Sequence, residues 1–115
     1  MIERMSQTKT LTHKDAQIAE FLKSRLEKIT PIQRMLVYGS RARGNFLPDS
    51  DLDIFIEVPA LTPSLRRKIS EAAWEIGLDH DIVISTFAAS TQEIQNGPLG
   101  ANPILYFIEL DGIAL

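Results

Sequence analysis

Apolar residues near the start of the chain recur at steps of three and four, the spacing of one buried face of an amphipathic helix. They are Ala16, Ala19, Leu22, Leu26 and Ile29. Thr12 followed by Asp15 predicts the N-terminal cap of this helix, with Asp in place of the usual Glu, and Pro31 ends it. We expect the preceding residues, 1–11, to form a mobile or partly ordered start.

Three short segments are predicted to form strands. Residues 35–38 form an apolar run that leads into a Gly-Ser turn, and residues 81–85 form a second run, Asp-Ile-Val-Ile-Ser. Between them, residues 51–58 alternate, so that two sets of side chains face opposite ways. One set is apolar: Leu52, Ile54, Ile56 and Val58. The other set holds both aspartates of the segment: Asp51, Asp53, Phe55 and Glu57.

Two further helices complete the pattern. One begins at Thr62 or Ser64, and Gly77 suits a left-handed position at its end. Its apolar stripe consists of Leu65, Ile69, Ala72, Ala73 and Ile76. The last helix spans 103–110 and closes at Asp111-Gly112. Helices that alternate with strands predict an α/β or α+β fold, in which helices cover a sheet.

The composition fits one domain spanning residues 1–115. The chain has 115 residues, 44% of them hydrophobic and 23% charged, which is ordinary for a globular protein. A net charge of −3 argues against a broad nucleic-acid surface. The absence of cysteine excludes disulfides and thiolate metal sites. Because no apolar stretch is long enough for a membrane span and no secretory leader is evident, we expect no membrane association and a cytoplasmic location.

The candidate chemistry lies in Gly39-Ser40, which is followed after ten residues by Asp51 and Asp53. Glycine lets a phosphate approach the backbone closely, and serine adds a hydroxyl and an N–H. Arg43 offers a guanidinium whose donors match phosphate oxygens. The neighbouring Arg41 is a weaker candidate for phosphate contact, and both arginines could instead be solvated.

Asp51 and Asp53 lie two positions apart on one strand, so both carboxylates are on one face, with Cα atoms roughly 6.6 Å apart. Carboxylates at this spacing can share two metal ions, and Mg²⁺ is the natural choice because it accepts carboxylate and phosphate oxygens together. We expect a third acid on a neighbouring strand. Asp81 is the best candidate and Asp79 the alternative. Asp81 could also remain a plain strand-initiating acid.

The pattern G-S-R-A-R-G followed by S-D-L-D-I resembles the nucleotidyltransferases of the DNA polymerase β superfamily, and within it the minimal nucleotidyltransferase (MNT) group. The resemblance implies a polymerase β-like nucleotidyltransferase core, a mixed sheet with flanking helices. In that family the Gly-Ser turn binds the triphosphate, three acids bind two Mg²⁺ ions, and pyrophosphate leaves. Carried over, Gly39, Ser40 and Arg43 bind the nucleotide, and Asp51, Asp53 and Asp81 are the catalytic and metal-binding residues.

The same resemblance implies a biological role. Many MNT proteins are encoded beside a HEPN-domain protein and resemble antitoxins that AMPylate a tyrosine of that toxic ribonuclease. We therefore expect ATP as substrate, a HEPN-type toxin as partner, and a homo- or hetero-oligomer. Two alternatives stay open: a non-catalytic antitoxin that neutralises its partner by binding, and a nucleotidyltransferase acting on a small molecule or RNA. Trp74 is expected in the core or at an interface, and His80 at the surface or partly buried.

Overall fold

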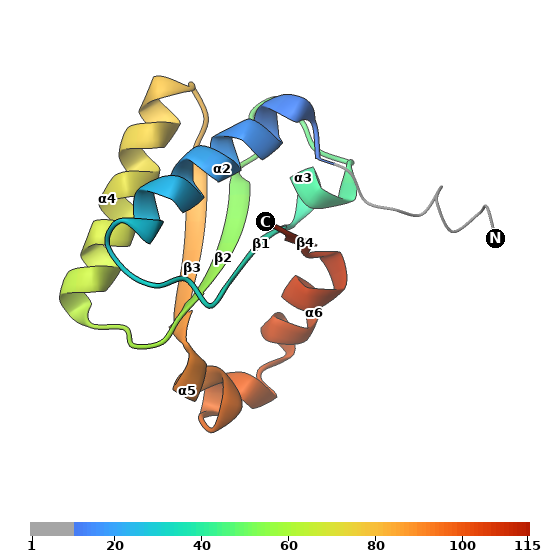
Figure 1. Cartoon of the computed structure of the whole chain (residues 1–115). Helices are drawn as coiled ribbons and strands as arrows, with labels where there is room; N and C mark the ends of the chain where they lie inside the picture. Colours follow the sequence, from blue (N-terminus) through green and yellow to red (C-terminus); the bar gives the residue numbers. More distant parts are fainter. Residues whose placement is uncertain (1–10) are drawn as a thin grey trace.

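The computed structural model describes residues 11–115, so the mobile start expected for residues 1–11 lies outside it except for Leu11, which packs against the core. Within residues 11–115, nine elements precede a short C-terminal strand (Figure 1). They are α2 (His13–Glu27), β1 (Arg34–Tyr38), α3 (Ser40–Arg43), β2 (Leu52–Val58), α4 (Pro63–Asp79), β3 (Ile84–Ser90), α5 (Thr91–Gln95), the 3-10 helix η1 (Pro98–Ala101) and α6 (Pro103–Asp111), followed by β4 (Ile113–Ala114).

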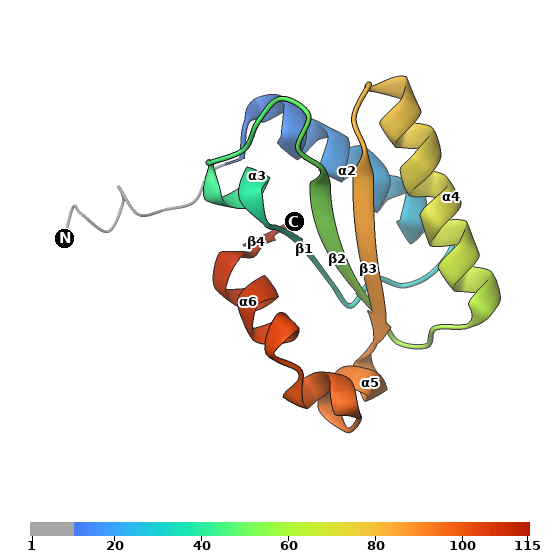
Figure 2. The same cartoon turned by 180° about the vertical axis from the view of Figure 1, so that it is seen from behind.

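The strands form one mixed sheet in the order β3-β2-β1-β4. β1 runs antiparallel to both β2 and β4, whereas β2 and β3 are parallel. Figure 1 shows α2 crossing in front of the strands, and in Figure 2 the strands cross in front of α2. The predicted mixed sheet with flanking helices is therefore confirmed.

Side chains along β2 point alternately to the two faces of the sheet and so divide the core into two layers, as the sequence predicts. Leu52, Ile54, Ile56 and Val58 pack with the buried stripes of α2 and α4. On the opposite face, Phe55 joins a second cluster with Leu105 and Ile108 of α6. Asp53 shares this second face, because it lies two positions before Phe55 on the same strand. The face of the sheet that α6 helps to cover is thus the one that carries the candidate chemistry.

The end of α4 and the start of β3 differ from the prediction. α4 continues to Asp79, and β3 begins only at Ile84, so Asp81 belongs to the connecting turn, where its φ is +56°. Asp81 thus takes the left-handed conformation predicted for Gly77. Gly77 stays inside the helix, and a Cβ there would collide with the carbonyl oxygen of Ile82. Close packing, and not a left-handed φ, is the reason for this glycine.

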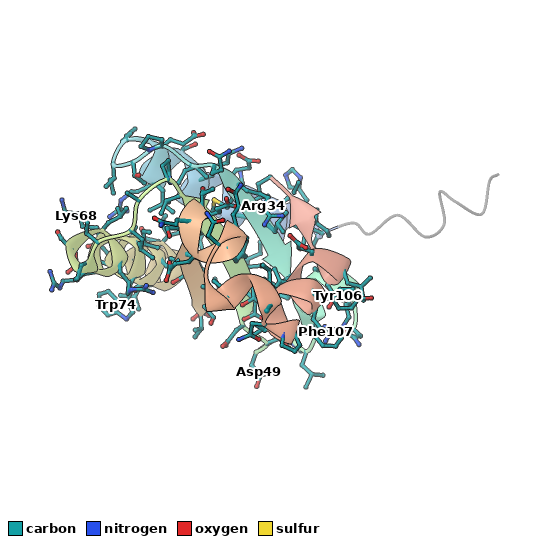
Figure 3. All side chains as sticks on the ribbon, turned by 90° about the horizontal axis from the view of Figure 1, so that it is seen from below. Arg34, Asp49, Lys68, Trp74, Tyr106 and Phe107 are labelled. Atoms are coloured by element: carbon teal, nitrogen blue, oxygen red, sulfur yellow. The ribbon has the colours of Figure 1, made fainter. Side chains whose placement is uncertain are left out.

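Two apolar residues lie at the surface. Ile29, predicted on the buried stripe of the first helix, lies beyond the end of α2. Trp74, expected in the core or at an interface, is not in the core, because it is 66% exposed on the outer side of α4 (Figure 3). His80 is partly buried as expected: its Nδ1 lies 2.9 Å from the carbonyl oxygen of Ile76, and its ring contacts Phe21. None of the helices between residues 11 and 115 has the length and apolar character needed to cross a membrane.

Candidate active site

The Gly39-Ser40 turn joins β1 to the short helix α3 and lies directly against Asp53. Gly39 has φ +79° and ψ −160°, a combination that essentially only glycine adopts. A Cβ at this position would collide with Oδ2 of Asp53 and come within 3.3 Å of its Cγ. Both the backbone conformation and the neighbouring carboxylate therefore require glycine here, and the turn lies beside the candidate catalytic strand.

Asp51 and Asp53 influence each other electrostatically. Asp51 precedes β2 and is exposed, whereas Asp53 is half-buried on the strand, opposite Tyr38 of β1 and Ser85 of β3. Burial, followed by the negative charge of Asp51, raises the pKa of Asp53, and the charge of Arg43 lowers it. The two carboxylates therefore form a pair of like charges that a bound cation would stabilise.

Tyr38 belongs to this site, although the sequence reasoning treated it only as part of an apolar run. It pairs with Asp53 across the β1–β2 ladder. Burial, and then the charge of Asp53, raises the pKa of the Tyr38 phenol, so the phenol stays neutral at physiological pH. A tyrosine that directly precedes the Gly-Ser turn was the available signal, but strand periodicity alone could not show which residue it faces.

The two arginines after Ser40 have different environments. Arg43 is exposed, and its Nη1 donates a 2.8 Å hydrogen bond to Oδ2 of Asp111 at the end of α6. Its charge also acts on Asp53, so it lies within electrostatic reach of the site. Arg41, by contrast, is buried and paired with Asp15 of α2. The weaker phosphate candidate is thus a structural residue, and Asp15 and Asp111 are partners that the sequence reasoning did not identify.

Asp81 lies on the turn before β3, where it lines a surface cavity of about 270 Å³ together with Asp49 and Ser50 of the loop that precedes Asp51. Among residues 11–115, no group of three acidic, histidine or cysteine side chains is arranged to hold a metal ion. β3 itself, Ile-Ser-Thr-Phe-Ala-Ala-Ser, carries no acid beside Asp53. Asp79, the alternative third acid, is exposed at the last position of α4. The structure thus brings together Gly39, Asp51, Asp53 and Arg43, and places Asp81 apart from them on the neighbouring turn.

A family model described as "Nucleotidyltransferase domain" matches residues 16–95, well over half of the chain. This chain belongs to the nucleotidyltransferase domain family. The matched residues include the Gly39-Ser40 turn, Asp51, Asp53 and the whole of β3. In this nucleotidyltransferase domain, α6 lies beyond the matched region, yet it supplies Asp111 to Arg43.

Among solved structures, the chain is similar to one in a crystal structure of a mutant of the toxin–antitoxin MntA–HpeT. The TM-score is 0.54 at 17% identity, and the likeness covers 87% of this chain and 70% of that one. No curated protein matches this nucleotidyltransferase domain. At this level of identity the structural likeness concerns the fold, and it confirms the predicted polymerase β-like nucleotidyltransferase core.

Proposed function

We propose that this nucleotidyltransferase domain transfers the AMP group of ATP to an acceptor hydroxyl, with Mg²⁺ held by Asp51 and Asp53. The observation that carries the proposal is the position of the Asp53 carboxylate against Gly39, with the charge of Asp51 acting on it, all within the family-matched region. The prediction of two Mg²⁺ ions with Asp81 as third ligand stands as part of the proposal. Asp81 lies on the neighbouring turn, where it lines a cavity together with Ser50, the residue before Asp51.

The residues present fit a divalent cation. Both donors are carboxylate oxygens, the ligands that Mg²⁺ prefers, and their mutual repulsion is relieved when a cation lies between them. Phosphate oxygens of the nucleotide would complete the coordination sphere. When bound, Mg²⁺ would neutralise charge on the phosphates and polarise the one that is attacked.

The chain's own residues bind and orient the nucleotide. Gly39 has no side chain, so the triphosphate can approach the backbone, and the hydroxyl of Ser40 donates to a phosphate oxygen. Arg43, whose pair with Asp111 is exposed, would turn its guanidinium to a phosphate, which it binds through the same kind of charge-assisted hydrogen bonds. The acceptor oxygen then bonds to the α-phosphorus while the bond from that phosphorus to the bridging oxygen breaks, and pyrophosphate leaves.

We propose that the carboxylate of Asp81 accepts the proton of the acceptor hydroxyl. Because Asp81 lines a cavity together with Ser50, the acceptor would enter from that side, next to Asp51. Asp81→Asn tests this role without backbone strain, since asparagine also tolerates the φ of +56°. Asp79→Asn, two residues earlier at the end of α4, is the matched control. We expect slower transfer only in Asp81→Asn, and equal rates in both variants would remove Asp81 from the mechanism.

For the acceptor we propose a tyrosine of a HEPN-type toxin, which makes this domain an antitoxin acting in the cytoplasm. The likeness to a chain of the toxin–antitoxin MntA–HpeT supports this assignment. The test is to incubate the full chain with Mg²⁺, ATP labelled at the α-phosphate, and a purified HEPN-type toxin. We expect label on a tyrosine of that protein, and none with Asp51→Ala plus Asp53→Ala. No label with the unsubstituted chain would refute the assignment.

One observation favours a second candidate, an antitoxin that neutralises its partner by binding alone. Among the described residues no third acid joins Asp51 and Asp53, and β3 carries none. Growth of cells that express the toxin distinguishes the two functions. If Asp51→Ala plus Asp53→Ala still protects these cells at normal expression, binding alone is sufficient. Loss of protection by a variant that still binds the toxin supports catalysis.

A further inference from the structure

The buried ion pair of Arg41 and Asp15 connects α3, which follows the Gly39-Ser40 turn, to α2. Nη1 of Arg41 donates to both carboxylate oxygens of Asp15, at 3.1 and 3.0 Å. The two residues are only 6% and 1% exposed, so water screens this interaction little. Asp15 lies in the first turn of α2 and Arg41 in α3, 26 residues later. The pair therefore fixes α3 to the helical layer on the other side of the sheet from α6.

The rest of the guanidinium holds the loop that leads to Asp51. Nε donates to the carbonyl oxygen of Ser50 at 2.9 Å, and Nη2 donates to that of Pro48 at 3.0 Å. The ring of Phe46 lies 4.5 Å from the guanidinium carbon, in cation–π contact. All three nitrogens of Arg41 are thus engaged, two of them by the backbone of the loop over residues 44–51.

These contacts link the two parts of the candidate site, the Gly39-Ser40 turn and Asp51. Arg41 directly follows Ser40 of the phosphate-binding turn, and Ser50, whose carbonyl it binds, directly precedes Asp51. We propose that Arg41, held by Asp15, is a positioning residue that sets Asp51 relative to Gly39-Ser40. The inference rests on the proposed nucleotidyl transfer, because it assigns Arg41 a role in that site.

A purely stabilising role explains this arrangement less well. A buried ion pair gains little stability over an apolar pair of similar size, because the desolvation of two charges offsets their attraction. A guanidinium, however, can reach a carboxylate and two separate carbonyls at once from one rigid fork, and neither an apolar side chain nor lysine can do so. The loop therefore requires the planar donor geometry of the guanidinium in addition to its charge.

Arg41→Lys tests the inference, because lysine keeps the charge beside Asp15 but loses the fork. We expect binding of Mn²⁺–ATP, measured by electron paramagnetic resonance of the metal, to weaken by about tenfold, as for other outer supports of metal sites. We also expect the amides of Leu47 and Ser50, which form hydrogen bonds within the loop, to exchange hydrogen about tenfold faster. Loop exchange does not depend on enzymatic activity.

Arg34→Lys is the matched control. Arg34 also binds two groups with its fork, Glu57 at 3.1 Å and Glu109 at 2.7 Å, and its guanidinium carbon lies 5.4 Å from the ring centroid of Phe55. It stands at the opposite end of β1 from the Gly39 turn. We expect Arg34→Lys to lower thermal stability while Mn²⁺–ATP binding and loop exchange stay within about twofold of the unsubstituted chain. This control separates positioning from general loss of stability.

The outcomes distinguish this inference from the proposed function. If the unsubstituted chain does not bind Mn²⁺–ATP, the proposed function is wrong, and loop exchange alone decides whether Arg41 fixes the loop. If Arg41→Lys is folded and matches Arg34→Lys in binding and loop exchange, positioning is wrong. Should Arg41→Lys fail to fold, the double variant Asp15→Asn plus Arg41→Gln replaces it, because it removes both buried charges together and the guanidinium fork with them. Unchanged binding and loop exchange in this double variant would then refute the inference.

Discussion

Replacing Gly39 with alanine should cost stability in two separable ways. The backbone at φ +79° and ψ −160° is strained for any residue with a Cβ, by about 1–3 kcal/mol. The new Cβ would also collide with Oδ2 of Asp53, and forcing an extra methyl group into a packed site costs about 1–3 kcal/mol. We therefore expect Gly39→Ala to lower the free energy of unfolding by about 2–6 kcal/mol, against a total of about 5–15 kcal/mol for a domain.

Gly44→Ala is the control, because Gly44 also has a positive φ, in the milder left-handed region, and a Cβ there meets no neighbour. Gly44 has φ +88° and ψ 5°, and nothing lies within 4 Å of a Cβ built there. Its substitution should cost only about 1–2 kcal/mol. Urea unfolding followed by circular dichroism measures both variants, and Mn²⁺–ATP binding should be lost in Gly39→Ala only, since Asp53 has to turn away.

A double-mutant cycle isolates the collision. In the Asp53→Ala background the carboxylate is absent, so Gly39→Ala should cost only the backbone strain, and the two substitutions should couple by about 1–3 kcal/mol. If Gly39→Ala costs no more than Gly44→Ala, or if the coupling stays below about 0.5 kcal/mol, the contact between turn and carboxylate does not determine the residue at this position.

Two further predictions concern charged groups. Because burial and a like charge raise the pKa of Asp53 in the folded state, its protonation favours folding below the pKa of the unfolded chain, and this contribution is lost as pH rises through the folded pKa. Asp53→Asn should therefore be more stable than the unsubstituted chain near neutral pH, and the difference in their free energies of unfolding should shrink in acid. A difference that does not change with pH in urea unfolding would contradict this. Asp15→Asn leaves the charge of Arg41 buried and unpaired and should lower the free energy of unfolding by about 3–5 kcal/mol. Glu75→Gln, which breaks the exposed pair with Arg25, should lower the free energy of unfolding by less than about 1 kcal/mol. Equal losses in the two variants would refute the different contributions expected of the buried and the exposed ion pair.

The strands and the faces of their side chains could be predicted from the sequence because a period of two fixes which residues lie together. Leu52 and Asp53 are assigned to opposite faces by this rule alone, and the structure agrees. The start of β3 could not be located in the same way. Residues 82–84 are uniformly apolar, so periodicity does not distinguish strand from turn, and the left-handed φ of Asp81 leaves no sequence signal of the kind a glycine would.

The roles of the two arginines were beyond sequence reasoning for a different reason. Arg41 and Arg43 are two positions apart on a helical turn, so their side chains point in different directions. The direction each takes depends on partners distant in the sequence, Asp15 and Asp111. Local spacing identifies both as donors for phosphate, but only tertiary packing decides that Arg41 is buried and that Arg43 is exposed, where a phosphate can reach it.

The site contains features that oppose folding, and these bear on the choice between catalysis and binding alone. Two repelling carboxylates, one of them half-buried, lower the stability of the free protein, as functional sites commonly do, and the turn beside them admits only glycine. A surface that only covers a toxin has no use for either feature, whereas a site for Mg²⁺ and a triphosphate needs both. Because β3 offers no third acid, further oxygen ligands for Mg²⁺ would come from the nucleotide, from water or from the turn at Asp81. A destabilising carboxylate pair that is useful only when a cation and a triphosphate are bound therefore favours catalysis over binding alone.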